Sequence, residues 1–137
     1  MNFCTAIILA VFRMVVIPVQ FEDREFIRTT EDIRASVQQA EDYFNSQPGL
    51  DDEYRFDLAP VITLPKPVAY YGANYSDRKD VLLHEAVRYA CSKSKIDFSP
   101  YDNDFDGSVD NVFLITAGFS EADGAAEEWI WPQFGQL

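Results

Sequence analysis

The chain of 137 residues contains 47% hydrophobic and 25% charged residues, a composition typical of one folded domain rather than a disordered chain. Its 11 basic and 23 acidic residues give a net charge of −12, which argues against nucleic-acid binding because the chain would repel phosphates. Nine of the acidic residues, and no Lys or Arg, lie in residues 96–137, where they alternate with apolar residues. This local acidity indicates a cation site rather than an acidic tail.

The first 14 residues are apolar but match neither a membrane span nor an export signal. An apolar run extends from Phe3 to Phe12, and Arg13 interrupts it before the next run begins at Met14. The run is shorter than the roughly 20 residues that cross a bilayer, so we expect no membrane anchor. No Lys or Arg precedes it, so there is no convincing signal peptide. We interpret residues 1–14 as a strand extension or a poor export leader, and residues 15–137 as the folded part.

The segment Val11–Phe21 predicts a strand that is covered on both faces, because it is rich in β-branched and other apolar residues. Pro18 removes one main-chain donor, which predicts a sheet edge or a bulge at that point. Thr29 or Thr30 can cap a helix that a Pro-Gly pair at 48–49 ends. The apolar stripe of this helix recurs at helical spacing and consists of Ile33, Val37, Ala40 and Phe44.

The rest of the chain continues the alternation of strands and helices. Tyr54, Phe56 and Leu58 alternate with charged residues, as in a half-buried strand. The remaining predicted segments are a short strand at 61–64, a loop at 70–72, a helix from Ser76 or Asp77 to about Ser92, a strand buried on both faces at 112–117, and an edge strand at 128–131. This order predicts an α/β fold with a mixed, mostly parallel sheet and flanking helices.

The acidic segment from Asp102 to Asp110 reads D-x-D-x-D-G-x-x-D and predicts a structural calcium site. Alternate carboxylates can direct hard oxygen atoms at one centre, and Gly107 permits the sharp turn around it. An EF-hand is excluded, because Phe113 stands where the bidentate Glu belongs and a strand follows the loop. The predicted calcium ligands are Asp102, Asp104, Asp106, the main-chain carbonyl of Ser108, and Asp110. The alternative is a solvated acidic turn without an ion.

The sequence contains no complete catalytic motif. His84 and Glu85 begin like the zinc motif H-E-x-x-H, but Arg88 occupies the fifth position and has no lone pair for a metal. His84 is the only histidine and lies on a predicted helix surface, and the chain has no G-x-S-x-G motif. A serine or cysteine nucleophile would therefore lack a base. Cys4 and Cys91 lack zinc-ligand spacing, and we interpret them as small buried residues, with a disulfide between them left open.

Eight short motifs follow one another between Val15 and Pro132. They are VVIPVQFED (15–23), DYFN (42–45), VITLP (61–65), YYG (70–72), DFSPYDND (97–104), VDNVF (109–113), AG (117–118) and IWP (130–132). In this order and with these gaps, the chain resembles the N-terminal part of the catalytic domain of the immune inhibitor A-type secreted zinc metalloendopeptidases. No single motif would suffice, and the resemblance depends on their order.

The resemblance implies a zincin-like α/β domain that hydrolyses peptide bonds with zinc-activated water and binds calcium at the acidic loop. It also implies a protein or peptide substrate and an extracellular or cell-envelope location. Phe105 departs from the small residue, often glycine, that the family has in the loop. The family's zinc helix follows the Trp-Pro segment, where the family often has His and this chain has Gln133. Because the zinc ligands have no counterpart before Leu137, we expect no Zn²⁺ ligands and no catalysis by this chain alone.

Two further expectations concern partners. Without the zinc helix, an apolar sheet face is left uncovered, which favours self-association or the binding of a missing C-terminal segment. The first alternative to the peptidase interpretation is a standalone calcium-stabilised binding module that presents residues 128–131 as an edge strand to a partner. The second is an enzyme that uses a carboxylate pair.

Overall fold

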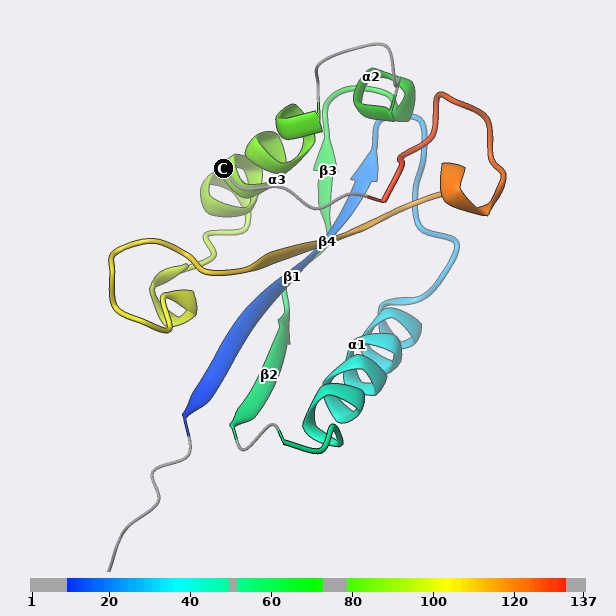
Figure 1. Cartoon of the computed structure of the whole chain (residues 1–137). Coiled ribbons are helices and arrows are strands. Elements are labelled where there is room, and N and C mark those ends of the chain that lie inside the picture. The colour runs from blue at the N-terminus through cyan, green and yellow to red at the C-terminus, as the bar shows by residue number, and fades with distance from the viewer. Residues whose placement is uncertain (1–9, 50–51, 73–78, 133–137) are drawn as a thin grey trace, which may run out of the picture.

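The computed structural model describes residues 10–49, 52–72 and 79–132, in which strands alternate with helices (Figure 1). The elements are β1 (Val11–Phe21), α1 (Thr30–Asn45), β2 (Glu53–Leu58), β3 (Ile62–Leu64), α2 (Val68–Gly72), α3 (Lys79–Lys93) and β4 (Val112–Thr116). Two 3-10 turns, Ser99–Tyr101 and Glu121–Asp123, precede and follow β4. The predicted α/β class is confirmed. Among the described helices, none is long and apolar enough to cross a membrane.

β1 is the central strand of a four-stranded sheet, and the pairings between the described strands are parallel. β2 pairs with β1 from Val11 to Val16, and β3 pairs with it from Val19 to Phe21. β4 also pairs with β1, so that Val112 lies opposite Val15. The prediction of a mostly parallel sheet with flanking helices is therefore confirmed.

Pro18 lies inside this central strand, so the predicted edge or bulge is wrong. The N–H of Ala59 donates to the carbonyl of Val16 on the side of β2, and the N–H of Ala117 donates to the carbonyl of Val19 on the side of β4, both at 2.8 Å. Main-chain groups of successive residues point to alternate sides of a strand, so Pro18 faces the same side as Val16. There β2 has ended and β3 has not begun, and the missing N–H interrupts no ladder.

One face of the sheet is covered by α2 and α3. Alternate residues of β1 point to this face, and they pack in one buried cluster with residues of β3 and of both helices. The cluster contains Val15, Ile17, Val19, Phe21, Ile62, Leu64, Val68, Tyr71, Leu82, Ala86, Ala90 and Tyr101. Leu82, Ala86 and Ala90 of α3 lie in this cluster, and Tyr89 packs against it.

α1 lies against β2 and contributes to the core on the other face (Figure 1). It begins as predicted, because the Thr29 side chain accepts the N–H of Asp32 while the Asp32 carboxylate accepts the N–H of Thr29. The ring of Phe44 packs on Phe56 of β2, and Phe56 packs on Phe113 of β4, with centroids 5.4 and 5.7 Å apart. Phe113 is nevertheless 41% exposed. The prediction that β4 is buried on both faces is therefore wrong.

Two other segments differ from their predictions. Residues 70–72, predicted as a loop, lie in the short helix α2, whose first N–H, of Val68, donates to the Asp23 carboxylate at 2.8 Å. Residues 128–131, predicted as an edge strand, contribute only a single parallel bridge from Ile130 to Ser120. The ring of Trp129 instead packs beside Phe119, at a centroid distance of 5.6 Å.

The predictions for the N-terminus and the cysteines are tested only in part. β1 begins at Val11, so residues 11–14 are a strand extension, whereas residues 1–9, including Cys4, lie outside the described residues. Cys91 is exposed, so its predicted burial is wrong. Ser76 and Asp77, the predicted start of the second long helix, also lie outside the described residues.

Candidate cation site

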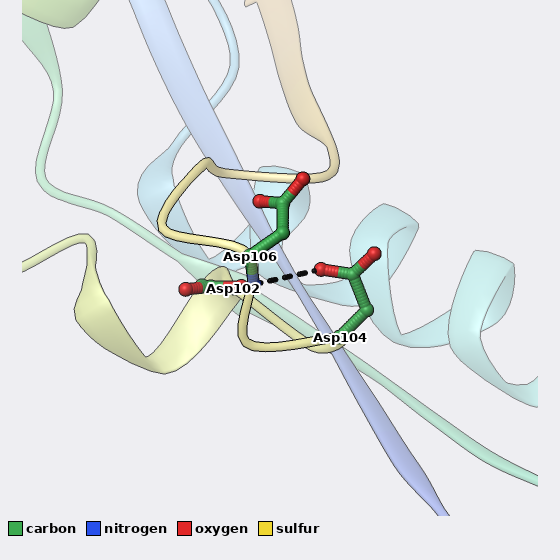
Figure 2. A group of neighbouring side chains, drawn as sticks. All are labelled: Asp102, Asp104 and Asp106. Atoms are coloured by element: carbon green, nitrogen blue, oxygen red, sulfur yellow. Dashed lines mark hydrogen bonds between the residues drawn. The ribbon is translucent and has the colours of Figure 1, made fainter.

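The acidic loop lies between the 3-10 turn at Ser99–Tyr101 and β4, beside the central strand. Figure 2 shows Asp102, Asp104 and Asp106 as neighbours on this loop, with the N–H of Asp106 donating to the Asp104 carboxylate. One carboxylate oxygen from each residue lies within 4.8 Å of the corresponding oxygens of the other two. Asp102 is half-buried, and the other two side chains are exposed. Among the described residues this is the one group of three or more acidic, His or Cys side chains close enough to share a metal ion.

Main-chain N–H groups hold the three carboxylates in place. The two oxygens of Asp102 accept the N–H groups of Asp106 and Gly107 at 3.0 and 2.9 Å. Asp104 accepts the N–H of Asp106 at 3.1 Å, and Asp106 accepts the N–H of Ser108 at 2.7 Å. The bonds of Asp104 and Asp106 come from the alternating spacing, because an Asp side chain readily accepts a donor two residues later, whereas Asp102 accepts donors from across the turn. The loop is thus closed by its own acids.

The tight turn depends on two residues with positive φ. Gly107 has φ +91°, as its type allows. Phe105 has φ +62°, in the left-handed region that favours glycine, and its ring is 89% exposed. The ring is therefore largely in solvent.

Asp110 and Ser108, the other two predicted ligands, do not join the three acids through their side chains. The Asp110 carboxylate accepts the main-chain N–H of Asn103 at 2.6 Å and its side-chain amide at 3.0 Å. It therefore braces the two ends of the loop against each other. Ser108 donates its N–H to Asp106, and its main-chain carbonyl stays a predicted ligand.

Asn103 is a key residue of the site that the sequence did not single out. Its Oδ1 accepts the N–H of Arg13 at 2.7 Å, and its Nδ2 donates to the carbonyl of Arg13 at 3.0 Å. The amide thus pairs with β1 as a neighbouring strand would, just before β4 begins to do so. An Asn between two acids is common in such loops, so the sequence of the loop gives no sign of this role. It is seen only from the hydrogen bonds to Arg13, 90 residues away.

The side chain of Arg13 extends the attachment to β2. Its guanidinium donates to Asp57 at 2.9 and 2.7 Å and lies over the Tyr101 ring, 5.9 Å from the centroid. Burial, and to a lesser extent the Asp57 charge, raises the pKa of Tyr101 above its usual value. The 3-10 turn that leads into the acidic loop therefore packs on Arg13, the residue of β1 that Asn103 binds and that is itself paired with Asp57 of β2.

The residues near the incomplete zinc motif do not form a zinc site. His84 is exposed, and Glu85 accepts the hydroxyl of the buried Tyr71 at 2.6 Å. Burial, and next this hydrogen bond, raises the pKa of Tyr71 far above its usual value. Arg88 lies beside the Tyr89 ring with its charged carbon 5.7 Å from the centroid. Zn²⁺ would find one histidine here and a guanidinium in place of the second, so the donor set does not fit.

The side-chain ligand atoms that the acidic loop offers are carboxylate oxygens, which Ca²⁺ and Mg²⁺ prefer. Calcium fits the loop better, because it accepts irregular cages of main-chain and carboxylate oxygens. Comparisons of this chain with protein-family models, with curated proteins and with solved structures find no match.

Proposed function

We propose that this chain is a calcium-stabilised α/β unit that corresponds to the N-terminal part of an immune inhibitor A-like zinc metalloendopeptidase domain. The observation that carries the calcium proposal is the convergence of Asp102, Asp104 and Asp106 within 4.8 Å on a closed loop. The ordered motifs between Val15 and Pro132 support the family and the zincin-like fold. A protein or peptide substrate and a secreted location belong to the same proposal.

Calcium has a structural role in this proposal. The ion would offset the repulsion between three adjacent carboxylates, and it would fix a loop that Asn103 and Tyr101 attach to β1 and β2. Ligand binding to the folded state stabilises it by mass action, by about 2.7 kcal/mol at a hundredfold excess over Kd. Bound calcium would therefore stabilise the attachment of the acidic loop to the sheet.

Catalysis is not proposed for this chain alone. Zinc-activated water needs three protein ligands and an open fourth position. His84 is the only histidine in the sequence, and its neighbourhood does not fit zinc. We therefore expect no peptide-bond hydrolysis by the purified chain in the presence of Zn²⁺.

Calcium binding is tested by thermal unfolding in EDTA and then in excess CaCl₂. We expect a higher melting temperature in calcium, and a smaller rise for Asp104→Asn, which keeps the acceptor oxygen but removes the charge. Glu127→Gln is the matched control, because it removes an exposed acid outside the loop. Equal calcium responses in Asp104→Asn and in the parent protein would exclude the loop as the site.

The family proposal has a separate test. The nucleotide sequence downstream of the Leu137 codon should encode an H-E-x-x-H segment, in frame or interrupted. Its absence would contradict the peptidase interpretation and leave the calcium result unaffected.

A standalone binding module is the second candidate function, and one observation favours it. β4 pairs with β1 on one side, and no other strand of the described part of the chain pairs with it. The sequence predicted an edge strand at residues 128–131, whereas in the structure the open edge is at β4.

A further inference from the structure

The outer side of β4 offers main-chain groups to a partner. The Ala117 N–H bonds to β1, so alternate residues back to Phe113 face β1 as well, and Leu114 and Thr116 face away from it. Within the described part of the chain, no main-chain hydrogen bond engages the outward groups of Leu114 or Thr116. An open strand edge of this kind is a template for another strand.

An apolar groove lies next to this edge on the face that α1 only partly covers. It has a volume of about 300 Å³, and its lining includes Phe26, Ile33, Ile115 and Phe119. Phe119 is 69% exposed, and Ile27 at the rim is 94% exposed. Two arginines also line the groove, but Arg24 stacks on Trp129 at 4.9 Å and Arg28 lies 3.5 Å from Ser36. Exposed apolar surface beside an open edge is typical of a docking site.

Acidic residues flank β4 at both of its ends, whereas the two arginines of the groove, Arg24 and Arg28, lie on the loop before α1. Asp110 precedes β4, Glu121 and Asp123 follow it, and residues 96–137 contain no Lys or Arg. A second copy of the chain would bring the same acids to the edge, so like charges disfavour a β4–β4 pair. A segment with basic residues beyond both ends of an apolar core would instead be attracted.

We propose that the outer edge of β4 binds an extended, basic-flanked segment of another protein as an added strand. The main chain of the segment pairs with Leu114 and Thr116, and an apolar side chain occupies the groove beside Ile115. This inference rests on the second candidate function, the binding module, and names its partner; it does not depend on the calcium or peptidase proposals.

The test uses a labelled peptide of alternating valine and threonine with two lysines at each end, measured by fluorescence anisotropy with the full chain in EDTA. We expect saturable binding, and a Kd at least about tenfold higher when glutamates replace the lysines. Methylation of alternate backbone nitrogens on the pairing side should abolish binding. Equal binding of the methylated peptide, or no binding of the lysine peptide, would overturn the proposal.

Two variants locate the binding edge. Thr116→Pro removes an outward N–H that the sheet does not use, so the β1 ladder is retained and the peptide Kd should rise at least about tenfold. Thr116→Val is the matched control and should bind like the parent protein. Retained peptide binding by a folded Thr116→Pro variant would overturn the proposal. If that variant does not fold, the methylated peptide tests the same edge with the parent protein. Dimerisation that the lysine peptide fails to reverse would also overturn it, in favour of a second copy.

Discussion

Asn103 holds both main-chain groups of Arg13, accepting its N–H at 2.7 Å and donating to its carbonyl at 3.0 Å, across 90 residues of sequence. The amide side chain thereby takes the place of a peptide group in a neighbouring strand. β4 takes over this side of β1 two residues later, where Val112 lies opposite Val15. The acidic loop is therefore an extension of the sheet, and the stability of each should depend on the other.

Replacing Asn103 tests this attachment. Asn103→Ala removes the two hydrogen bonds to the main chain of Arg13 and the bond from the amide to Asp110, at about 1 kcal/mol each, so the free energy of unfolding should fall by about 2–3 kcal/mol. Urea denaturation measures the change. Asn111→Ala, at an exposed position two residues before Phe113, is the control and should stay within about 0.5 kcal/mol of the parent. Equal stabilities of the two variants would contradict the attachment.

Phe105 stores backbone strain that a glycine would release. A left-handed residue other than glycine costs about 1–2 kcal/mol, whereas glycine loses about 0.5–1 kcal/mol more chain entropy on folding. Phe105→Gly should therefore raise the free energy of unfolding by roughly 0.5–1 kcal/mol.

Phe105→Ala is the control for this change, because it removes the exposed ring and keeps the positive φ. It should unfold within about 0.5 kcal/mol of the parent protein in the same urea titration. If the glycine variant is no more stable than the alanine variant, the strain at this position is not real.

The sequence predicted those parts of the fold that local patterns encode. The apolar run of β1 and a helix cap at Thr29 or Thr30 are short-range signals, and both are confirmed, with Thr29 as the cap. The predicted apolar stripe of α1 is buried at Ile33 and Val37, whereas Phe44 at its end is exposed. The prediction for Pro18 was wrong because the effect of a proline depends on whether another strand pairs with the side that its nitrogen faces, and β2 has already ended there. α2 was missed because its N-terminal cap comes from Asp23, 45 residues away.

The candidate site divides in the same way. Asp102, Asp104 and Asp106 were predicted from a spacing that is local, and the structure brings their oxygens together. Asp110 has the right spacing for a ligand, but its carboxylate is taken by Asn103. The contribution of Asn103 itself depends on Arg13, which no pattern within the loop could indicate.

Gly72 is required by close packing, because the main chain of Glu128 and Trp129 leaves no room for a side chain there. A Cβ at this position would meet the main-chain oxygens of Glu128 and Trp129 closer than real Cβ atoms approach. Gly72→Ala should therefore cost about 2–3 kcal/mol of stability, as overpacking against a main chain that has little room to move. Residues 128–129 would be expected to detach first, which the intrinsic fluorescence of Trp129 can report.

Gly124→Ala is the comparison for Gly72. Gly124 has φ +91° and open space around its Cβ position, so only the backbone cost of about 1–2 kcal/mol applies. Trp129 fluorescence should be unchanged in this folded variant. A fluorescence change in Gly124→Ala, or none in Gly72→Ala, would contradict the packing of α2 on the Glu128–Trp129 main chain.

Tyr71 makes the stability of the core dependent on alkaline pH. Its hydroxyl donates to Glu85 at 2.6 Å and its ring packs 5.5 Å from Phe21, and burial followed by this hydrogen bond raises its pKa above 10. Above about pH 10 the unfolded chain loses the phenol proton while the folded chain keeps it. Because the unfolded chain then binds one proton fewer than the folded chain, raising the pH favours unfolding. The free energy of unfolding therefore falls by up to about 1.4 kcal/mol per pH unit.

Tyr71→Phe removes this proton and with it the dependence. The stability difference between the parent and Tyr71→Phe should be constant below about pH 9 and should shift toward the variant above about pH 10. Tyr43→Phe, which removes an exposed hydroxyl, should show no such shift relative to the parent over that range if burial is the cause. Urea titrations from pH 8 to pH 11 measure all three proteins. If the difference between the parent and Tyr71→Phe stays constant throughout, the Tyr71–Glu85 bond does not hold the proton in the folded state.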